Sequence, residues 1–152
     1  MKRNGARLVM LMAVVAGVLL VVSRTHMSAE ERAERLIGRT GSLSDFGSGW
    51  LDLATPTTFH RGDKLRIEVG GTASRILVRL LPVGFSPDNP DLVVERNIAV
   101  PPKDRVITIT LGADYRNISQ ISVHGNRVAF RQFLLGDGNG PATIVSVDHL
   151  KR

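Results

Sequence analysis

The stretch Lys64-Leu65-Arg66-Ile67-Glu68-Val69 alternates charged and apolar side chains without a break. Because successive side chains of a β-strand point to opposite faces, this pattern predicts a strand with one buried face and one solvated face. The same period of two recurs at residues 75–81, 107–111, 121–124 and 145–148. Less regular candidates for strands are residues 50–54, 92–100 and 128–135.

Turn-forming residues separate these segments, and no helical pattern lies between them. The connections are Arg61-Gly62-Asp63, Gly70-Gly71, Ser86–Pro90, Pro101-Pro102, Gly125-Asn126 and Gly136–Pro141. About eight short strands at such spacing are typical of antiparallel all-β folds. The sequence therefore predicts a β-sandwich or jelly roll over residues 45–152.

The alternation also predicts which side chains fill the space between the two sheets. The apolar centres of three segments should point inward: Ile67, Ile109 and Val123. Their sequence neighbours of opposite parity should face water: Arg66, Thr108 and Ser122.

The N-terminus carries a different pattern, typical of export. Lys2, Arg3 and Arg7 precede an unbroken apolar run, Leu8–Val22, which Ser23 and Arg24 close. At 15 residues the run is shorter than the roughly 20 that span a bilayer, and it fits a secretory h-region. Residues 1–23 are thus predicted to be a signal anchor or a cleaved signal peptide. The C-terminal part would then be membrane-anchored and extracytoplasmic, or secreted if the leader is cleaved.

Residues 24–44 are predicted to form a short helix and a linker. Ser28-Ala29-Glu30-Glu31 has the form of a capping box. The apolar residues Ala29, Ala33, Leu36 and Ile37 fall on one helical face, and Gly38 is placed to end the helix. The Gly, Ser, Thr and Asp residues that follow lack periodicity, which indicates a linker.

Composition excludes several classes of protein. The chain has 20 Lys and Arg against 14 Asp and Glu, but three of the cations lie in residues 1–7. The remaining 17 cations are interspersed with acids, and one Trp, one Tyr and five Phe provide no aromatic platform. We therefore expect no nucleic-acid partner. The absence of cysteine excludes disulfides, thiolate metal sites and cysteine nucleophiles.

No motif for catalysis is present. The chain lacks the Gly-x-Ser-x-Gly and His-Glu-x-x-His patterns, so we expect no enzymatic activity and no cofactor. His60, His124 and His149 lie in different predicted elements, and we interpret them as isolated surface or hydrogen-bonded histidines rather than metal ligands. Arg61-Gly62-Asp63 is interpreted as a tight turn in which Gly62 takes a positive φ and the Asp63 side chain bonds the backbone.

Three segments together resemble a known family of domains. They are Phe59-x-x-Gly62-Asp63-x-Leu65-x-Ile67, Ile121-Ser122-Val123-His124-Gly125 and Asn139-Gly140-Pro141-Ala142-Thr143-Ile144. Residues 48–150 resemble small extracytoplasmic β-sandwiches of the galactose-binding-like, jelly-roll kind. The resemblance implies binding of a sugar or surface ligand through loops at one end of the sandwich.

The candidate ligand-binding residues are Trp50, His124, Asn126, Asp137 and Asn139. Trp50 either seals the sandwich or stacks on a ligand. The sequence Asp137-Gly138-Asn139-Gly140 resembles a fragment of a calcium loop, but no later Glu completes it, and a metal-free turn is favoured. Whether this loop binds calcium is left open.

Two hypotheses of function follow. The first is a non-catalytic interaction or scaffold subunit at the cell envelope, held to the membrane through its N-terminal helix and bound to an envelope protein. The alternative is a module that binds carbohydrate or another surface ligand. Convergence of Trp50, His124 and Asp137 on one patch would favour the second hypothesis.

The N-terminal apolar run predicts that the chain is inserted in a membrane. Residues 8–23 should form a membrane-inserted helix, because an unbroken apolar run behind three cations has no other favourable environment. Cell fractionation should recover the full-length protein with membranes and release it only with detergent. Recovery of the intact chain from the detergent-free soluble fraction would contradict this assignment.

Overall fold

The computed structural model describes residues 32–43, 47–86, 92–125, 128–130, 133–135 and 140–152. Every regular element longer than one turn in these ranges is a β-strand. The strands are β1 (Arg32–Arg35), β2 (Gly38–Leu43), β3 (Ser48–Phe59), β4 (Lys64–Gly71), β5 (Arg75–Pro82), β6 (Val93–Ala99), β7 (Val106–Thr110), β8 (Tyr115–His124), β9 (Val128–Phe130), β10 (Phe133–Leu135) and β11 (Ala142–Lys151).

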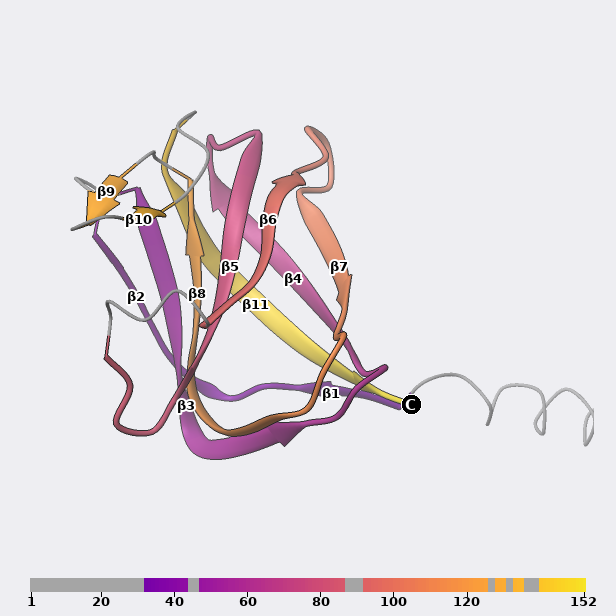
Figure 1. Ribbon diagram of the computed structural model, residues 1–152. Coiled ribbons are helices and arrows are strands. Elements are labelled where there is room, and N and C mark those ends of the chain that lie inside the picture. The colour runs from indigo at the N-terminus through magenta and orange to yellow at the C-terminus, as the bar shows by residue number, and fades with distance from the viewer. Residues whose placement is uncertain (1–31, 44–46, 87–91, 126–127, 131–132, 136–139) are drawn as a thin grey trace, which may run out of the picture. The chain divides into compact units, whose positions relative to one another are not determined.

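The strands form two main sheets in which every pairing is antiparallel (Figure 1). One has four strands in the order β1-β11-β4-β7, and the other has five in the order β2-β3-β8-β5-β6. The short strands β9 and β10 pair with each other. The predicted all-β, antiparallel fold is confirmed, and the arrangement is consistent with a β-sandwich.

One apolar cluster, built from both sheets, forms the core. Ile67 and Ile109 contribute from the four-stranded sheet and Val123 from the five-stranded sheet, and all three are buried as the alternation predicts. Arg66 and Thr108 are exposed, again as predicted. The period of two therefore identified the inward face of each of these strands correctly.

Ser122 departs from the prediction, because only 4% of its surface is exposed. Its side chain points outward as expected, because its neighbours Ile121 and Val123 point inward. On the outward face, however, Ser122 lies opposite Trp50 of β3 and Arg79 of β5. A small hydroxyl between two large side chains is covered by them, so outward orientation does not give solvent exposure.

The predicted helix and linker at residues 24–44 are wrong wherever the structure describes this segment. Residues 32–35 form β1 and residues 38–43 form β2, so the sheets begin at Arg32 rather than at residue 45. A helix of about ten residues is marginal in isolation. The open edge of β11, by contrast, carries backbone groups that need partners, and β1 supplies them.

The connection between β1 and β2 joins the two sheets. The Leu36 N–H donates to the Val147 carbonyl of β11 at 2.9 Å, and the Ile37 carbonyl accepts from the Ala54 N–H of β3 at 2.9 Å. Adjacent residues thus bond to opposite layers. This segment closes one side of the domain.

The predicted membrane helix lies outside the described residues. Within the described ranges, no helix has the length and apolar character needed to cross a bilayer.

The revised boundary can be tested by truncation. A fragment of residues 45–152 lacks β1 and β2, which leaves the edges of β11 and β3 unpaired. We expect its free energy of unfolding to be lower than that of residues 32–152 by on the order of 3 kcal/mol or more, since several backbone hydrogen bonds are lost. Denaturant titration of both fragments measures the difference. Equal stability would show that β1 and β2 are dispensable to the domain.

Candidate functional site

The turn before β4 builds one wall of a pocket at the end of the domain. The Asp63 N–H donates to the His60 carbonyl at 3.0 Å, and the His60 N–H donates to Asp63 Oδ2 at 2.9 Å. Gly62, between them, has a φ of 93°. The interpretation of Arg61-Gly62-Asp63 as a tight turn is confirmed.

A buried carboxylate and imidazole form the floor of this pocket. His149 of β11 places Nε2 2.7 Å from Asp63 Oδ2, and the Arg152 N–H donates to Asp63 Oδ1 at 3.2 Å. Burial by itself raises the pKa of Asp63, but the hydrogen bonds from His60, His149 and Arg152 outweigh it and lower the pKa. Asp63 is thus an ionised carboxylate.

His149 is a hydrogen-bonded histidine, which is one of the two forms expected for the three histidines. Its side chain is buried, it bonds Asp63, and its ring meets the Phe59 ring edge-on with 4.8 Å between centroids. The backbone N–H of His60 donates a hydrogen bond to the same carboxylate. Residues 60 and 149 are far apart in the sequence, so only the β4–β11 pairing could have revealed this contact.

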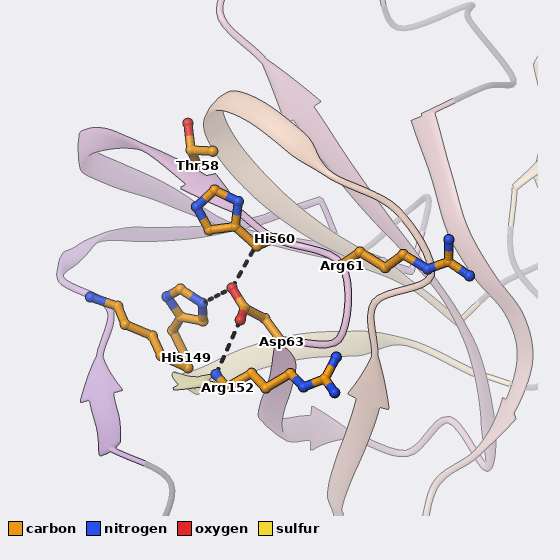
Figure 2. Close-up of a pocket in the computed structure, with 7 residues that line it drawn as sticks. Thr58, His60, Arg61, Asp63, His149 and Arg152 are labelled. Carbon is orange, nitrogen blue, oxygen red and sulfur yellow. Dashed lines mark hydrogen bonds and ion pairs between the residues drawn. The ribbon is translucent and has the colours of Figure 1, made fainter.

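Figure 2 shows the pocket that these residues line. It has a volume of about 500 Å³, within the range of roughly 300–1,000 Å³ that small-molecule sites occupy. Its lining residues are Thr58, His60, Arg61, Asp63, His149, Lys151 and Arg152. The Lys151 ammonium is paired with Glu34 Oε2 at 2.6 Å. We call this site the end pocket.

The sequence-predicted residue Trp50 lies elsewhere, on the outward face of the five-stranded sheet. Its neighbour Leu51 is buried in the core, so the indole points away from it. Gly41 of β2 lies opposite Trp50, and a Cβ at Gly41 would be only 2.5 Å from the indole ring. The indole therefore packs against the backbone of β2 and does not seal the core.

His124 lies on the same outward face as Trp50 but is buried. Ser48 Oγ is 2.7 Å from His124 Nδ1, and Ser122 Oγ is 3.1 Å from Nε2. Burial, with a smaller contribution from the charge of Arg79, lowers the pKa of His124 to about 4. The imidazole is thus neutral and fully hydrogen-bonded, and it positions the two serines.

The sequence analysis missed two polar residues beside Trp50, the exposed Asp52 and the half-buried Gln120. Gln120 Nε2 donates to Asp52 Oδ1 at 2.6 Å, and Asp52 shares the outward face of β3 with Trp50. Asn126, Asp137 and Asn139 lie outside the described residues. Among the residues the structure describes, no three His, Cys, Asp or Glu side chains gather as a metal site would require.

Comparison of the chain with family models, with curated proteins and with solved structures finds no match. The likeness to galactose-binding-like sandwiches therefore rests on the residues quoted for it and stays a prediction.

The buried His124 predicts a loss of stability in acid. Because its folded pKa, about 4, lies below its ordinary value of 6.5, the unfolded chain binds the proton more tightly. The resulting stability is complete above pH 6.5 and is lost as the pH falls to about 4, by roughly 3 kcal/mol.

Denaturant titrations at pH 7, 5.5 and 4.5 should show this decline in the native protein. The His124→Gln variant keeps a donor and an acceptor but has no charge to gain, so its stability should decline less over the same interval. An equally steep decline in both proteins would contradict the assignment to His124.

Proposed function

We propose that this chain is a non-catalytic interaction module of the cell envelope, tethered by its N-terminal segment and bound to a protein partner through the Trp50 face. This face comprises the outward side chains of Arg39, Leu43, Trp50, Asp52 and Gln120. The first four lie on the adjacent strands β2 and β3, and Gln120 of β8 lies opposite Asp52.

The observation that carries the proposal is the contrast between the two outer faces of the domain. On the four-stranded sheet, Asp148 is bonded to both Arg35 and Arg66, so these three side chains already have partners within that face. On the Trp50 face, an indole is half-buried and the side chain of Leu43 is 52% exposed. The four-stranded sheet also exposes one apolar side chain, Val145, but the Trp50 face adds a half-buried indole to its exposed leucine and so gains more by being covered.

The chemistry of the Trp50 face fits a protein surface. Trp and Arg are over-represented among residues that dominate binding energy in protein interfaces, and here Trp50 lies beside Arg39. The indole is held in place by the backbone of Gly41, so it loses little conformational freedom on binding. The buried hydrogen-bond network of His124, Ser48 and Ser122 lies on the same outward side of the sheet.

A glycan ligand is the second candidate, favoured by one observation. The carboxylate of Asp52 and the amide of Gln120 lie next to Trp50 and are bonded to each other at 2.6 Å. An aromatic ring flanked by such polar groups can stack on a sugar ring while they bond its hydroxyls. Loops at the end of a jelly roll, as the family resemblance implies, would add to such a site.

The proposal predicts that Trp50→Ala weakens binding while the domain stays folded. Proximity cross-linking in intact cells, followed by mass spectrometry, should recover an envelope protein with the native chain. Trp50→Ala should reduce its recovery at least tenfold, as expected when an interface Trp contributes about 2 kcal/mol or more.

Val145→Ala is the matched control, because Val145 is an apolar side chain 55% exposed on β11 of the other sheet. It should leave cross-linking unchanged. A glycan array probed with the same three proteins tests the second candidate. Trp50-dependent glycan binding without a cross-linked protein would replace the first candidate with the second.

A further inference from the structure

Strand β2 is an outer strand of the five-stranded sheet, and among the described strands it pairs on one side only, with β3 (Figure 1). The ladder between them has no register shift, and the Ile37 carbonyl continues it by accepting from the Ala54 N–H. Alternate residues of an antiparallel strand bond the same neighbour. The odd-numbered residues of β2 therefore bond β3, whereas Gly38, Thr40 and Ser42 direct their N–H and C=O groups to the open edge.

The other outer strands of the two main sheets are less suited to pairing with another chain. β1 is short and mostly charged. β6 has register shifts against β5, and Asn97 within it has a φ of 58°. The exposed side chains of β7 are Thr108 and Thr110, which offer a partner little apolar area. Short length, charges and bulges are the usual means by which edge strands avoid association, so β2 is the edge that stands open.

Two large apolar side chains are exposed at the two ends of β2. The side chain of Ile37 is 76% exposed and that of Leu43 is 52% exposed. Both residues share the parity of Gly41, which lies opposite Trp50, so both side chains lie on the outward face of the sheet. Covering them with a second strand would remove apolar surface from water, which is favourable.

The features of this edge are symmetric about Thr40. Ile37 and Leu43 lie at equal distances from it in the sequence, and so do Gly38 and Ser42. We propose that two copies of the chain pair β2 with β2 in antiparallel fashion about a twofold axis at Thr40, which joins their five-stranded sheets into one continuous sheet. Ile37 of each copy then lies opposite Leu43 of the other, as a self-complementary interface requires.

The same pairing brings the cation of β2 onto an aromatic ring. Arg39 of one copy lies opposite Gly41 of the other, so the two guanidinium groups do not face each other. The Trp50 indole packs over Gly41, where an added Cβ would be 2.5 Å from the ring. Arg39 of the second copy therefore reaches this indole and makes a cation–π contact with it.

Alternative registers are less favourable. The hydrogen-bonding groups of the two edges meet again only after a shift of two residues. In one direction this shift places the two Arg39 side chains opposite each other, and like charges directly opposite are destabilising. In the other direction it places Leu43 opposite Arg39 and separates it from Ile37. The register centred on Thr40 is therefore the one that the side chains select.

The dimer goes beyond the proposed function and does not rest on it. Pairing occupies the edge of the sheet and needs no envelope protein, so it can be measured on the purified chain alone. Failure to form the dimer leaves the proposal of an envelope partner standing. Failure to cross-link such a partner in cells leaves the dimer standing.

Introduced cysteines test the register, because the chain has no cysteine of its own. Directly opposed residues of antiparallel strands have Cα atoms about 4.5–5.5 Å apart, a separation that a disulfide can bridge. In the purified full chain in detergent micelles, Thr40→Cys should form a disulfide-linked dimer on mild oxidation. Ile37→Cys and Leu43→Cys should cross-link when the two variants are mixed, and roughly tenfold less when each is oxidised alone, since each lies far from its own copy across the axis.

Val145→Cys is the matched control, because Val145 is also apolar and 55% exposed but lies on the four-stranded sheet. It should cross-link no more than Ile37→Cys alone. Equal cross-linking of Thr40→Cys and Val145→Cys would indicate random collision and overturn the proposal. Stronger cross-linking of Ile37→Cys with itself than with Leu43→Cys would overturn the register.

Substitution of Thr40 tests the dimer without a cross-link. Thr40→Pro removes an N–H that faces the open edge, so the ladder with β3 stays intact, but two interface hydrogen bonds are lost. Sedimentation equilibrium of the full chain in micelles should show a dimer dissociation constant raised by roughly tenfold or more. Thr40→Lys removes no backbone group and places two ammonium groups at the axis, and it should have the same effect. An unchanged dissociation constant in both variants would overturn the proposal, since association through the N-terminal segment alone would give that result.

Discussion

The carboxylate of Asp63 joins parts of the chain that are almost the whole domain apart in sequence. It closes the turn that leads into β4 and bonds both His149 and the backbone of Arg152 at the end of β11. Asp148 does the same on the outer face, where it links Arg35 of β1 to Arg66 of β4. Both carboxylates are buried, and hydrogen bonds to each keep its pKa below the ordinary value. The alignment of β1, β11 and β4 depends on these two charges as well as on the backbone ladder.

The sequence predicted the fold where strand periodicity decides it. A strand with one buried face, such as β4, alternates apolar and polar side chains. This alternation can be recognised from residues that are neighbours in the sequence. The prediction from periodicity failed at β1, because all of its residues are exposed and they do not alternate between apolar and polar. There the strand is determined by the open edge of β11, a partner more than a hundred residues away. It failed at Ser122 because exposure depends on Trp50 and Arg79, on other strands.

In the candidate sites, too, some residues could be predicted from the local sequence, whereas others are brought together only by strand pairing. Trp50 could be selected from the sequence because a single Trp beside a predicted strand is distinctive, but Asp52 and Gln120 become its neighbours only through the β3–β8 register. The turn at Arg61-Gly62-Asp63 was correctly interpreted as structural, since Gly62 supplies the required positive φ. Asp63 of this turn also bonds His149 in the pocket. That contact depends on the β4–β11 register, which cannot be predicted from residues adjacent in the sequence.

The antiparallel pairing of β1 with β11 has a mechanical consequence. Arg32, the first described residue, lies opposite Lys151, so the attachment point of the N-terminal segment is at one extremity of this ladder. Tension transmitted from a tether and directed along β1 would load its backbone hydrogen bonds in shear, all at once rather than one after another. The ion pairs of Arg35 with Asp148 and of Lys151 with Glu34 add resistance at the two ends of the ladder. If the segment before Arg32 tethers the domain, β1, a short and exposed strand, would be the element that carries this load.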